Sequence, residues 1–463
     1  MTSTESFNAV VLGSGEAGKY IAWDLAKAGQ SVVVIEDRYI GGSCPNIACL
    51  PSKNIIHSAA IARSVQTAAK FGSHVDSFAI SMAEVQTRKR AMVEGLIAMH
   101  QGRFKASGAE LVLGRGKFVG ERTIEVVLNG GGTRVMRGDK MFLDLGAFAA
   151  KPELPGLQAA GAMTHVELLD LDTRPEHLLI LGGGYIALEL AQAMARLGTR
   201  ITVCEKTERV LMREDPDIAV AVTAVLSGEG ITIVTGADVD RVSGRSGERV
   251  ALHGTVGSVA GQVIEGTHLL VALGKEPNTK GIGLDAAGVT VTPAGYIKVN
   301  DRLETTAPHV WAMGDCAGSP AFTHMAFDDY RIVRDNLAGK NRSTTGRQVP
   351  NCLFIEPELA RVGLNEIEAR KEGVAYRLAE LPITAILRTR TTGEQAGKLK
   401  ALVAPDDRIL GFTALAPRAG ELLPPVQLAM AAGLPYQQVE ALTIAHPTYS
   451  EGLISLFGNV PSA

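Results

Sequence analysis

The sequence predicts an α/β protein with two Rossmann-like nucleotide-binding domains and a third, mixed α+β domain at the C-terminal end. A strand, a glycine-rich turn, a helix and a second strand ending in an acidic residue occur near the N-terminus, and the same order recurs near residue 180. After about residue 349 the composition changes to shorter strand and helix patterns separated by prolines. With 463 residues, the chain is long enough for three domains.

The first nucleotide-binding unit begins with an apolar strand over residues 8–12, followed by the turn Gly13-Ser-Gly15-Glu-Ala-Gly18 and a helix that ends near Ala28. A second strand over residues 31–35 leads to Glu36. The first two glycines permit a tight turn and bring a diphosphate close to the helix N-terminus, and the acidic residue can accept hydrogen bonds from ribose hydroxyls. We therefore predict that Gly13, Gly15, Gly18 and Glu36 bind a dinucleotide.

The second unit repeats this order. A strand over residues 178–181 precedes the turn Gly182-Gly-Gly184-Tyr185-Ile186-Ala187, and a helix over 188–197 and a strand over 199–203 lead to Glu205. A carboxylate repels a ribose 2′-phosphate, so Glu205 favours NAD. Lys206 and Arg209 lie close enough in sequence to reverse this preference, so NADP stays possible.

Two of the five cysteines, Cys44 and Cys49, stand close together between Gly41-Gly42-Ser43 and Leu50-Pro51-Ser52-Lys53. On an undistorted helix their Cα atoms would be roughly 8–9 Å apart, beyond the ~7 Å limit for a disulfide, so a bridge requires the chain to bend near Pro45. A helix N-terminus favours the reactive thiolate. We interpret the pair as redox-active rather than as a structural disulfide or two unrelated thiols, and no further cysteine or histidine pair completes a metal site.

The segments between these motifs predict alanine-rich helices over residues 55–69 and 82–100 and short strands over 110–113 and 123–128. The turn Asn129-Gly-Gly-Gly132 predicts a hairpin to a further strand. Residues 231–272 alternate between strand and turn patterns.

Composition narrows the possible functions. The net charge is −3, which argues against nucleic-acid binding, and no run of about 18 apolar residues predicts a membrane span. The strand pattern that begins by Phe7 leaves no room for a secretory signal, and the cysteine pattern is not that of a secreted disulfide framework. We expect a cytoplasmic protein.

Six motifs occur in the order found in the class I pyridine nucleotide-disulfide oxidoreductases, which the chain resembles over nearly its whole length. This family includes dihydrolipoamide dehydrogenase, glutathione reductase and mercuric reductase. The motifs are Gly13-x-Gly15-x-x-Gly18, the segment from Gly41 to Lys53 with Cys44 and Cys49, Gly182 to Glu189, Leu273 to Asn278, Trp311-Ala-Met-Gly314-Asp315, and His446-Pro-Thr-Tyr-Ser-Glu451. The resemblance implies an FAD-binding domain formed by residues 1–149 and 273–346, an NAD(P)-binding domain formed by residues 150–272, and a C-terminal dimerisation domain formed by residues 347–463.

The resemblance also implies roles for single residues. Asp315 would bind the flavin ribityl chain, and the run Ala321, Phe322, Thr323 and His324 would pass the pyrimidine edge of the flavin. Lys53 would lie beside the flavin and pair with Glu189, and Tyr185 would cover the nicotinamide pocket until the cofactor enters. The remaining residues expected to bind a cofactor are Gly42, Ser43, Gly116, Gly314, Gly182, Gly184, Ile186, Glu205, Val239 and Gly274.

A histidine and a glutamate near the C-terminus predict an acid/base pair. Pro447 favours an extended His446, and Glu451 can fold back from a helix that begins near Ser450, so that its carboxylate orients the imidazole. The resemblance implies that this histidine belongs to the partner subunit of a homodimer and faces a Cys44–Cys49 disulfide. Electrons would then pass from NAD(P)H through FAD to Cys49, and Cys44 would exchange with the substrate.

Several departures from the family pattern leave the substrate open. Asp144-Leu-Gly146 stands where Ala-Thr-Gly is frequent, and Ser43, Ala48 and Lys275 also differ from the common residues. We expect a small-molecule disulfide or dithiol substrate, as for a dihydrolipoamide-type dehydrogenase. The alternatives are a mercuric-reductase-like stress reductase acting on a reactive oxidant or metal ion, although the tail after Phe457 lacks paired cysteines, and a flavoprotein component docked in a multienzyme complex.

Overall fold

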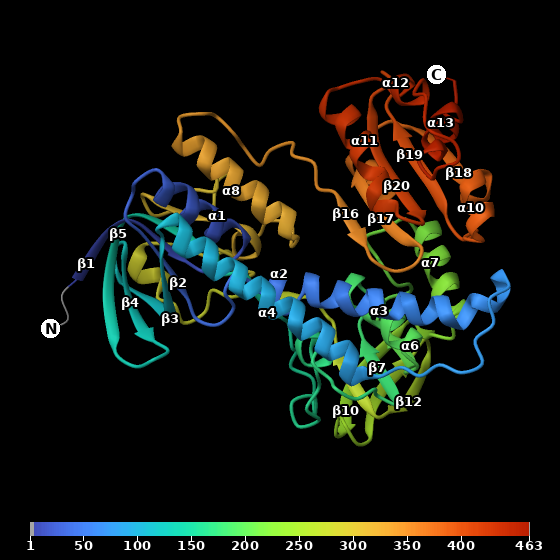
Figure 1. Cartoon of the computed structure of the whole chain (residues 1–463), viewed down its shortest axis with the longest axis horizontal. Coiled ribbons are helices and arrows are strands. Elements are labelled where there is room, and N and C mark those ends of the chain that lie inside the picture. The colour runs from blue at the N-terminus through green and yellow to red at the C-terminus, as the bar shows by residue number, and fades with distance from the viewer. Residues whose placement is uncertain (1–3, 463) are drawn as a thin grey trace. The chain divides into compact units, whose positions relative to one another are not determined.

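The computed structural model describes residues 4–462 and divides them into two compact units (Figure 1). The first unit combines residues 4–55, 83–150 and 274–347. The second combines residues 56–82, 151–273 and 348–462. Each unit contains one of the two predicted nucleotide-binding folds.

The first unit is built on a mixed sheet whose parallel part confirms the predicted strand–turn–helix–strand order. β1 (Thr4–Leu12) pairs with β2 (Val32–Glu36) on one side and with β5 (Thr133–Leu143) on the other, and β15 (Val310–Ala312) extends the sheet beyond β5. All five residues of β2 are buried, as expected for a strand covered on both faces. The helices α1 (Glu16–Lys27) and α8 (Thr323–Leu337) lie side by side in this unit (Figure 1).

The strand predicted over residues 110–113 is much longer in the structure. β3 (Glu110–Gly120) pairs with β2 through its first residues and then forms an antiparallel meander with β4 (Thr123–Leu128) and β5. A side chain at Gly114 would lie 2.6 Å from the Val127 carbonyl oxygen, and one at Gly116 would lie 2.7 Å from Leu12 Cδ1. Both glycines therefore serve close packing within the strand. The Asn129–Gly132 hairpin between β4 and β5 is confirmed.

The helices of this region also extend beyond the predicted ranges. A four-residue helix α2 (Ser43–Asn46) precedes α3 (Cys49–Thr67), which begins at the second cysteine and is followed by a 3₁₀ turn η1 (Ala68–Phe71). α4 (Met82–Ser107) continues beyond the predicted range of 82–100 at its C-terminal end. The other short elements of the first unit are β6 (Ala147–Ala149), β14 (Lys275–Pro277), η2 (Leu284–Ala287) and η3 (Gly314–Ala317).

The second unit contains the second nucleotide-binding fold. β7 (His177–Leu181), α6 (Tyr185–Arg196) and β8 (Arg200–Cys204) confirm the predicted order, and the parallel sheet runs β13-β7-β8-β9. An antiparallel sheet of β10, β11 and β12 follows β9 in the chain. The remaining bounds are α5 (His165–Leu168), α7 (Pro216–Gly228), β9 (Thr232–Val234), β10 (Ala237–Gly244), β11 (Val250–Val256), β12 (Val259–Gly266) and β13 (His268–Val271).

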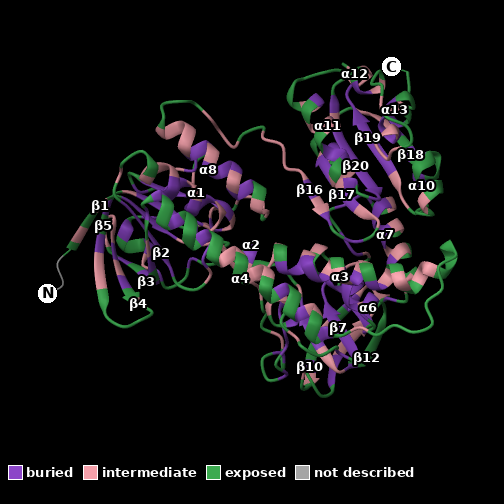
Figure 2. Cartoon of the chain, viewed as in Figure 1, coloured by how far each residue is buried: buried purple, intermediate pink, exposed green. Residues whose placement is uncertain are grey.

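The C-terminal part of the second unit has its own antiparallel sheet, in the order β16-β17-β20-β19-β18, and its own apolar core. β19 and β20 are almost wholly buried (Figure 2). The strands and helices of this part confirm the predicted mixed α+β composition. Its strands are β16 (Asn351–Leu353), β17 (Glu358–Gly363), β18 (Arg377–Pro382), β19 (Lys398–Val403) and β20 (Ile409–Ala416). Its helices are α9 (Glu366–Glu372), η4 (Ile383–Ala385), α10 (Leu387–Thr392), α11 (Ala419–Ala431), α12 (Gln437–Glu440) and α13 (Glu451–Gly458).

Among residues 4–462, none of the helices combines the length and apolar character that a membrane-spanning helix requires.

Candidate active site

The first glycine-rich turn has the backbone geometry that a diphosphate-binding loop needs. Gly13 has φ +100°, and a side chain there would lie 2.1 Å from the Asp144 carbonyl oxygen. Gly42, from the cysteine segment, has φ +87°, and its added Cβ would lie 2.7 Å from the Cα atom of Gly15. Glycine is therefore required where these two loops approach each other.

Glu36 closes this turn. Its carboxylate accepts hydrogen bonds from the backbone N–H and the hydroxyl of Ser14, at 3.0 and 2.8 Å, and from the N–H groups of Arg38 and Tyr39. The predicted ribose-binding acid thus also holds the loop that follows β1.

The second turn repeats this construction. Gly182 has φ +111°, and a side chain there would lie 2.5 Å from the Ala272 carbonyl oxygen. Glu205 accepts hydrogen bonds from the Gly183 N–H at 2.6 Å and from the Thr207 N–H and hydroxyl. The correspondence with Glu36 shows that both acids stabilise the same kind of turn.

The two cations that could favour NADP are already paired with acidic groups. Lys206 lies 2.9 Å from Asp238, and Arg209 lies 2.8 Å from Glu208. These two ion pairs largely neutralise the positive charge of Lys206 and Arg209 near Glu205.

The cysteine pair spans a break between two helices. Cys44 lies within α2 and Cys49 begins α3, and the break falls at Ile47 and Ala48. The prediction that the two residues do not share one regular helix is confirmed, although the bend lies after Pro45. Both cysteines are half-buried free thiols in this structure, and a hydrogen bond joins them.

The surroundings of the two thiols are unequal. The hydrogen bond from Cys44 lowers the pKa of Cys49, and Thr323, Lys53 and Lys275 add to this effect against the cost of burial. The Thr323 hydroxyl lies 3.3 Å from the Cys49 sulfur. The same hydrogen bond, together with burial, raises the pKa of Cys44. These surroundings favour the thiolate at Cys49 over the thiolate at Cys44.

The loop before α8 brings several predicted flavin-binding residues together. Asp315 lies in η3 and forms an ion pair of 3.0 Å with Lys275. The Gly314 N–H donates a 2.7 Å hydrogen bond to the buried carboxylate of Asp329, a residue that the sequence did not single out. Ala321 and His324 are exposed, and the rings of Phe322 and His324 stack with centroids 5.3 Å apart.

Tyr185, at the start of α6, is held by its hydroxyl. It lies 2.7 Å from the Glu214 carboxylate and 2.9 Å from the side-chain oxygen of Asn351. Burial and the neighbouring Glu214 raise the pKa of Tyr185, so its hydroxyl stays protonated and donates. Glu189, on the same helix, accepts a 2.9 Å hydrogen bond from the Phe354 N–H. Lys53 lies in α3, and its pairing with Glu189 stays a prediction.

The C-terminal acid/base pair has the predicted geometry. His446 Nδ1 lies 2.9 Å from Glu451 Oε1, and Glu451 Oε2 accepts a hydrogen bond of 2.8 Å from the Thr448 N–H. The bond from Thr448 and then that from His446 lower the pKa of Glu451. The side chain of His446 is 64 % exposed, so its other ring nitrogen is accessible.

Comparison with known proteins agrees with this geometry. Residues 7–329 match the family described as pyridine nucleotide-disulphide oxidoreductase, and residues 349–456 match its dimerisation domain. The chain belongs to the pyridine nucleotide-disulphide oxidoreductase family. It is therefore an enzyme that uses FAD and NAD(P)H, with two nucleotide-binding folds and a dimerisation domain.

Two relatives and one solved structure illustrate the family. The chain is 35 % identical over 461 residues to the probable pyridine nucleotide-disulfide oxidoreductase RclA of Escherichia coli (strain K12), covering 98 % of this chain and 99 % of that protein. It is 33 % identical to mercuric reductase of Shigella flexneri, covering 97 % and 80 % of the two chains. Its structure is similar to a Cu(II) complex of the HOCl-induced flavoprotein disulfide reductase RclA from Escherichia coli, with a TM-score of 0.89, 34 % identity, and 98 % and 99 % coverage.

For the other residues predicted to bind a cofactor, the structure gives their positions and, for the glycines, whether packing requires them. Ser43 begins α2, and Ile186 is an exposed residue of α6. An added Cβ at Gly184 would have open space, so neither packing nor a positive φ requires glycine there. Gly274 also has open space, but its φ of +118° favours glycine. Val239 lies half-buried in β10. Gly116 is explained by packing inside β3.

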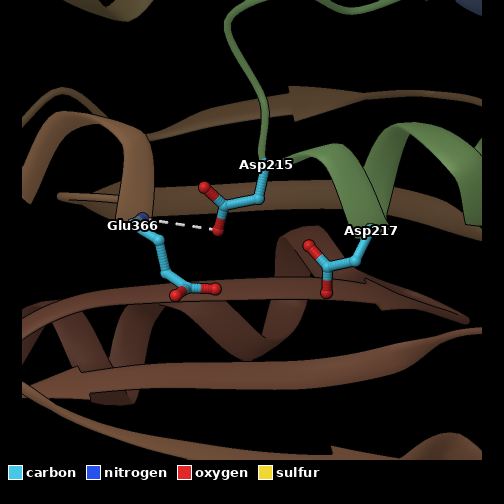
Figure 3. Close-up of side chains that lie close together, drawn as sticks. All are labelled: Asp215, Asp217 and Glu366. Carbon is cyan, nitrogen blue, oxygen red and sulfur yellow. Dashed lines mark hydrogen bonds between the residues drawn. The ribbon is translucent and has the colours of Figure 1, made fainter. Parts of the chain in front are cut away.

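Three carboxylates, one of them buried and two half-buried, lie close together in the second unit (Figure 3). Asp215 and Asp217, at the start of α7, and Glu366, in α9, surround the Lys400 ammonium at 2.8, 3.0 and 2.7 Å. The lysine is almost completely buried, and the three carboxylates hold its pKa above the usual range against the effect of burial. The cluster is thus an internal ion-pair network within the second unit.

Proposed function

We propose that the enzyme reduces its substrate through a cysteine pair with divided roles, in which Cys49 holds the charge beside the flavin and Cys44 exchanges with the substrate. The observation that carries this proposal is the inequality of the two thiols. The hydrogen bond from Cys44, followed by Thr323, Lys53 and Lys275, lowers the pKa of Cys49. The pKa of Cys44 is raised by Cys49 and by burial, although Thr323 acts in the opposite direction there. Bound FAD supplies the two-electron chemistry between NAD(P)H and this pair.

Side chains of the protein supply both the sulfur atoms and the proton transfers that the thiol–disulfide exchange requires. With a disulfide substrate, Cys44 loses a proton and attacks one substrate sulfur, which forms a mixed disulfide and releases the other sulfur as a thiolate. Cys49 then attacks Cys44, which forms the Cys44–Cys49 disulfide and releases the second substrate thiolate. His446 accepts the proton from Cys44 and delivers it to the leaving sulfur, and Glu451 fixes the ring so that Nε2 performs both transfers.

We further propose a homodimer in which His446 acts on the cysteine pair of the partner subunit. The dimerisation-domain match over residues 349–456 includes both His446 and Glu451. The imidazole is well exposed in the single chain, which supports a role at a surface covered only in the assembled enzyme.

NADH is the proposed reductant, and it is proposed to bind the fold formed by residues 150–272. Glu205 presents a carboxylate where a 2′-phosphate would be repelled, and Lys206 and Arg209 are occupied by Asp238 and Glu208. We also propose a cytoplasmic location, because the five cysteines of the chain do not have the pattern of a secreted disulfide framework.

The proposed substrate is a small disulfide or dithiol. A second candidate, reduction of a reactive oxidant or metal ion, is supported by the similarity to mercuric reductases and to a flavoprotein disulfide reductase described as HOCl-induced and as a Cu(II) complex. Both candidates use the same electron route and differ only in the final acceptor.

Paired cysteine variants test the division of roles. Cys44→Ser is expected to lose substrate reduction but to keep a long-wavelength absorption band from the Cys49 thiolate beside the flavin. Cys49→Ser is expected to lose both. Substrate turnover by the Cys44→Ser variant, or the band in the Cys49→Ser variant, would overturn the assignment.

A steady-state screen identifies the acceptor. Lipoamide, glutathione disulfide, cupric ion and mercuric ion are each assayed with NADH and with NADPH, and the Cys44→Ser variant serves as the control for reduction that bypasses the cysteine pair. Cysteine-dependent turnover of a disulfide supports the first candidate, and cysteine-dependent turnover of a metal ion alone supports the second.

A further inference from the structure

Asp144 is a buried carboxyl group at the centre of the FAD-binding unit, where the family frequently has alanine. It directly follows β5, a strand flanked by β1 and β15, and its N–H donates to the Leu12 carbonyl oxygen at 2.9 Å. This is the carboxyl edge of a parallel sheet, where such folds bind their ligands. The residue is only 7 % exposed.

Three glycines from the cofactor-binding motifs make room for this carboxyl group. A Cβ at Gly15 would lie 2.6 Å from Asp144 Oδ2, one at Gly314 would lie 3.2 Å from Oδ1, and one at Gly18 would lie 3.2 Å from the Asp144 Cβ. Side chains at these positions would therefore crowd the carboxyl group. The carboxyl group therefore lies between the turn after β1 and the loop that contains Asp315.

Asp144 also completes the N-terminus of α1. Gly15 is the N-cap residue and has no side chain to accept a hydrogen bond from the first turn of the helix. The Gly18 N–H donates instead to Asp144 Oδ2 at 2.7 Å. An acceptor from β5 thus caps α1 and leaves the N–H groups of Glu16 and Ala17 for a diphosphate, the group that binds at this end of the helix in such folds.

The charge around Asp144 sets its protonation. Burial raises the pKa of Asp144 to about 7; the hydrogen bond from Gly18 and the ammonium of Lys19 oppose this, whereas Asp315 and Glu16 add to it. Lys19 is itself paired with Glu16 at 2.6 Å, Asp315 is paired with Lys275, and the Cys316 thiol lies fully buried nearby. An anionic diphosphate brought to α1 adds negative charge, which favours the neutral acid further.

We infer that Asp144 is a positioning residue for FAD that caps the first helix as a neutral carboxylic acid, so that FAD binding is coupled to its protonation. When Asp144 loses its proton, a carboxylate faces the diphosphate and FAD is held less tightly. By linkage, retention of FAD weakens as pH rises through and above neutrality, by at most about tenfold per pH unit for a single proton.

The test compares FAD retention by the holoenzyme and its Asp144→Asn variant. Diluted holoenzyme is equilibrated between about pH 6 and about pH 8.5, and the free flavin is measured by its fluorescence. The wild-type dissociation constant is expected to rise with pH. Asp144→Asn keeps an acceptor for Gly18 without the acid and is expected to bind FAD with a flat pH profile. Asp285→Asn, at an exposed site in the same unit, is expected to follow the wild type.

Two further measurements separate this role from a merely structural one. Asp144→Ala removes the acceptor and is expected to bind FAD on the order of fivefold more weakly at pH 6, as for a lost helix cap, with a flat pH profile. The infrared carboxylic-acid C=O band of the wild type is expected to disappear as the pH rises. Identical profiles for wild type and Asp144→Asn, or a flat wild-type profile even if the variant fails to fold, would overturn the inference.

Discussion

The sulfur of Cys49 and the hydroxyl of Thr323, the first residue of α8, lie 3.3 Å apart. A hydroxyl can donate to a thiolate but gains much less from a thiol, so this contact stabilises the charged form. Together with Cys44, Lys53 and Lys275, it holds the pKa of Cys49 below its usual range.

Replacing Thr323 by valine removes this donor while nearly keeping the shape. We expect the pKa of Cys49 to rise by about one pH unit, since a hydrogen bond to a charged group contributes about 1.5 kcal/mol or slightly more. The measurement is a pH titration of the long-wavelength band in the two-electron-reduced enzyme, whose midpoint should move upward. Thr323→Ser keeps the hydroxyl and should leave the midpoint in place; an unchanged midpoint in Thr323→Val contradicts this role.

Two other elements, the start of α7 and the turn after β8, carry charges whose effects can be measured. In the first, Lys400 forms ion pairs with Asp215, Asp217 and Glu366, the three carboxylates drawn in Figure 3. Burial alone would raise the pKa values of Asp217 and Glu366, but their lysine partners, Lys398 and Lys400 for Asp217 and Lys400 for Glu366, outweigh burial and lower both.

Lys400→Met leaves buried carboxylates without their partner. We expect the free energy of unfolding to fall by about 3–5 kcal/mol at neutral pH. Since the lowered carboxyl pKa values stabilise the wild type only above their folded values, this contribution is lost as pH falls, and the difference between the proteins should shrink below about pH 4. Chemical unfolding at several pH values measures both effects.

The control for this change is Lys340→Met. That lysine is 67 % exposed and pairs with Asp335 at 3.6 Å, so we expect a cost below about 1 kcal/mol. Equal costs for the two lysines would show that the buried network does not stabilise the second unit.

Glu205 belongs to the turn after β8, and its replacement should change nucleotide preference. Glu205→Ala removes the acid that disfavours a 2′-phosphate and a bond to the Gly183 N–H. We expect kcat/KM for NADH to fall about tenfold while that for NADPH falls less, because a ribose acceptor contributes on the order of 1.5 kcal/mol. Glu248→Ala, at an exposed position, is the matched control. An unchanged ratio of the two kcat/KM values would contradict the proposed NADH preference.

At the element scale, local signals predicted more of the fold than of the site. The turns at Gly13 and Gly182 and the acids Glu36 and Glu205 follow from spacing alone, as does the His446–Glu451 contact. The length of β3 was missed because Gly114 and Gly116 normally weaken a strand, and their packing partners Val127 and Leu12 are remote in sequence.

The contacts that tune the site could not be predicted for the same reason. Thr323 is 274 residues from Cys49, and Asp144 is 126 residues from Gly18. Lys400 reaches acids 34 to 185 residues away. One indication in the sequence marked Asp144 as unusual, because the family frequently has alanine at this position. Its contact with Gly18 became visible only in the structure.

At the scale of the whole molecule, the proposed shared active site predicts complementation between two inactive variants. Cys44→Ser and His446→Ala chains are each expected to be inactive as homodimers. After equal mixing and subunit exchange, half of the dimers combine both chains and each of these has one intact site, so activity should recover to about a quarter of the wild type. No recovery, with exchange verified by mass, would place both residues of a site in one chain.

The central claim is that two sulfurs act with the flavin as one electron-accepting centre. An anaerobic dithionite titration of the holoenzyme, followed by its visible spectrum, tests this most directly. The enzyme should take up about four electrons per FAD, two at the flavin and two at the cysteine pair. An uptake of only two electrons per FAD would contradict the account.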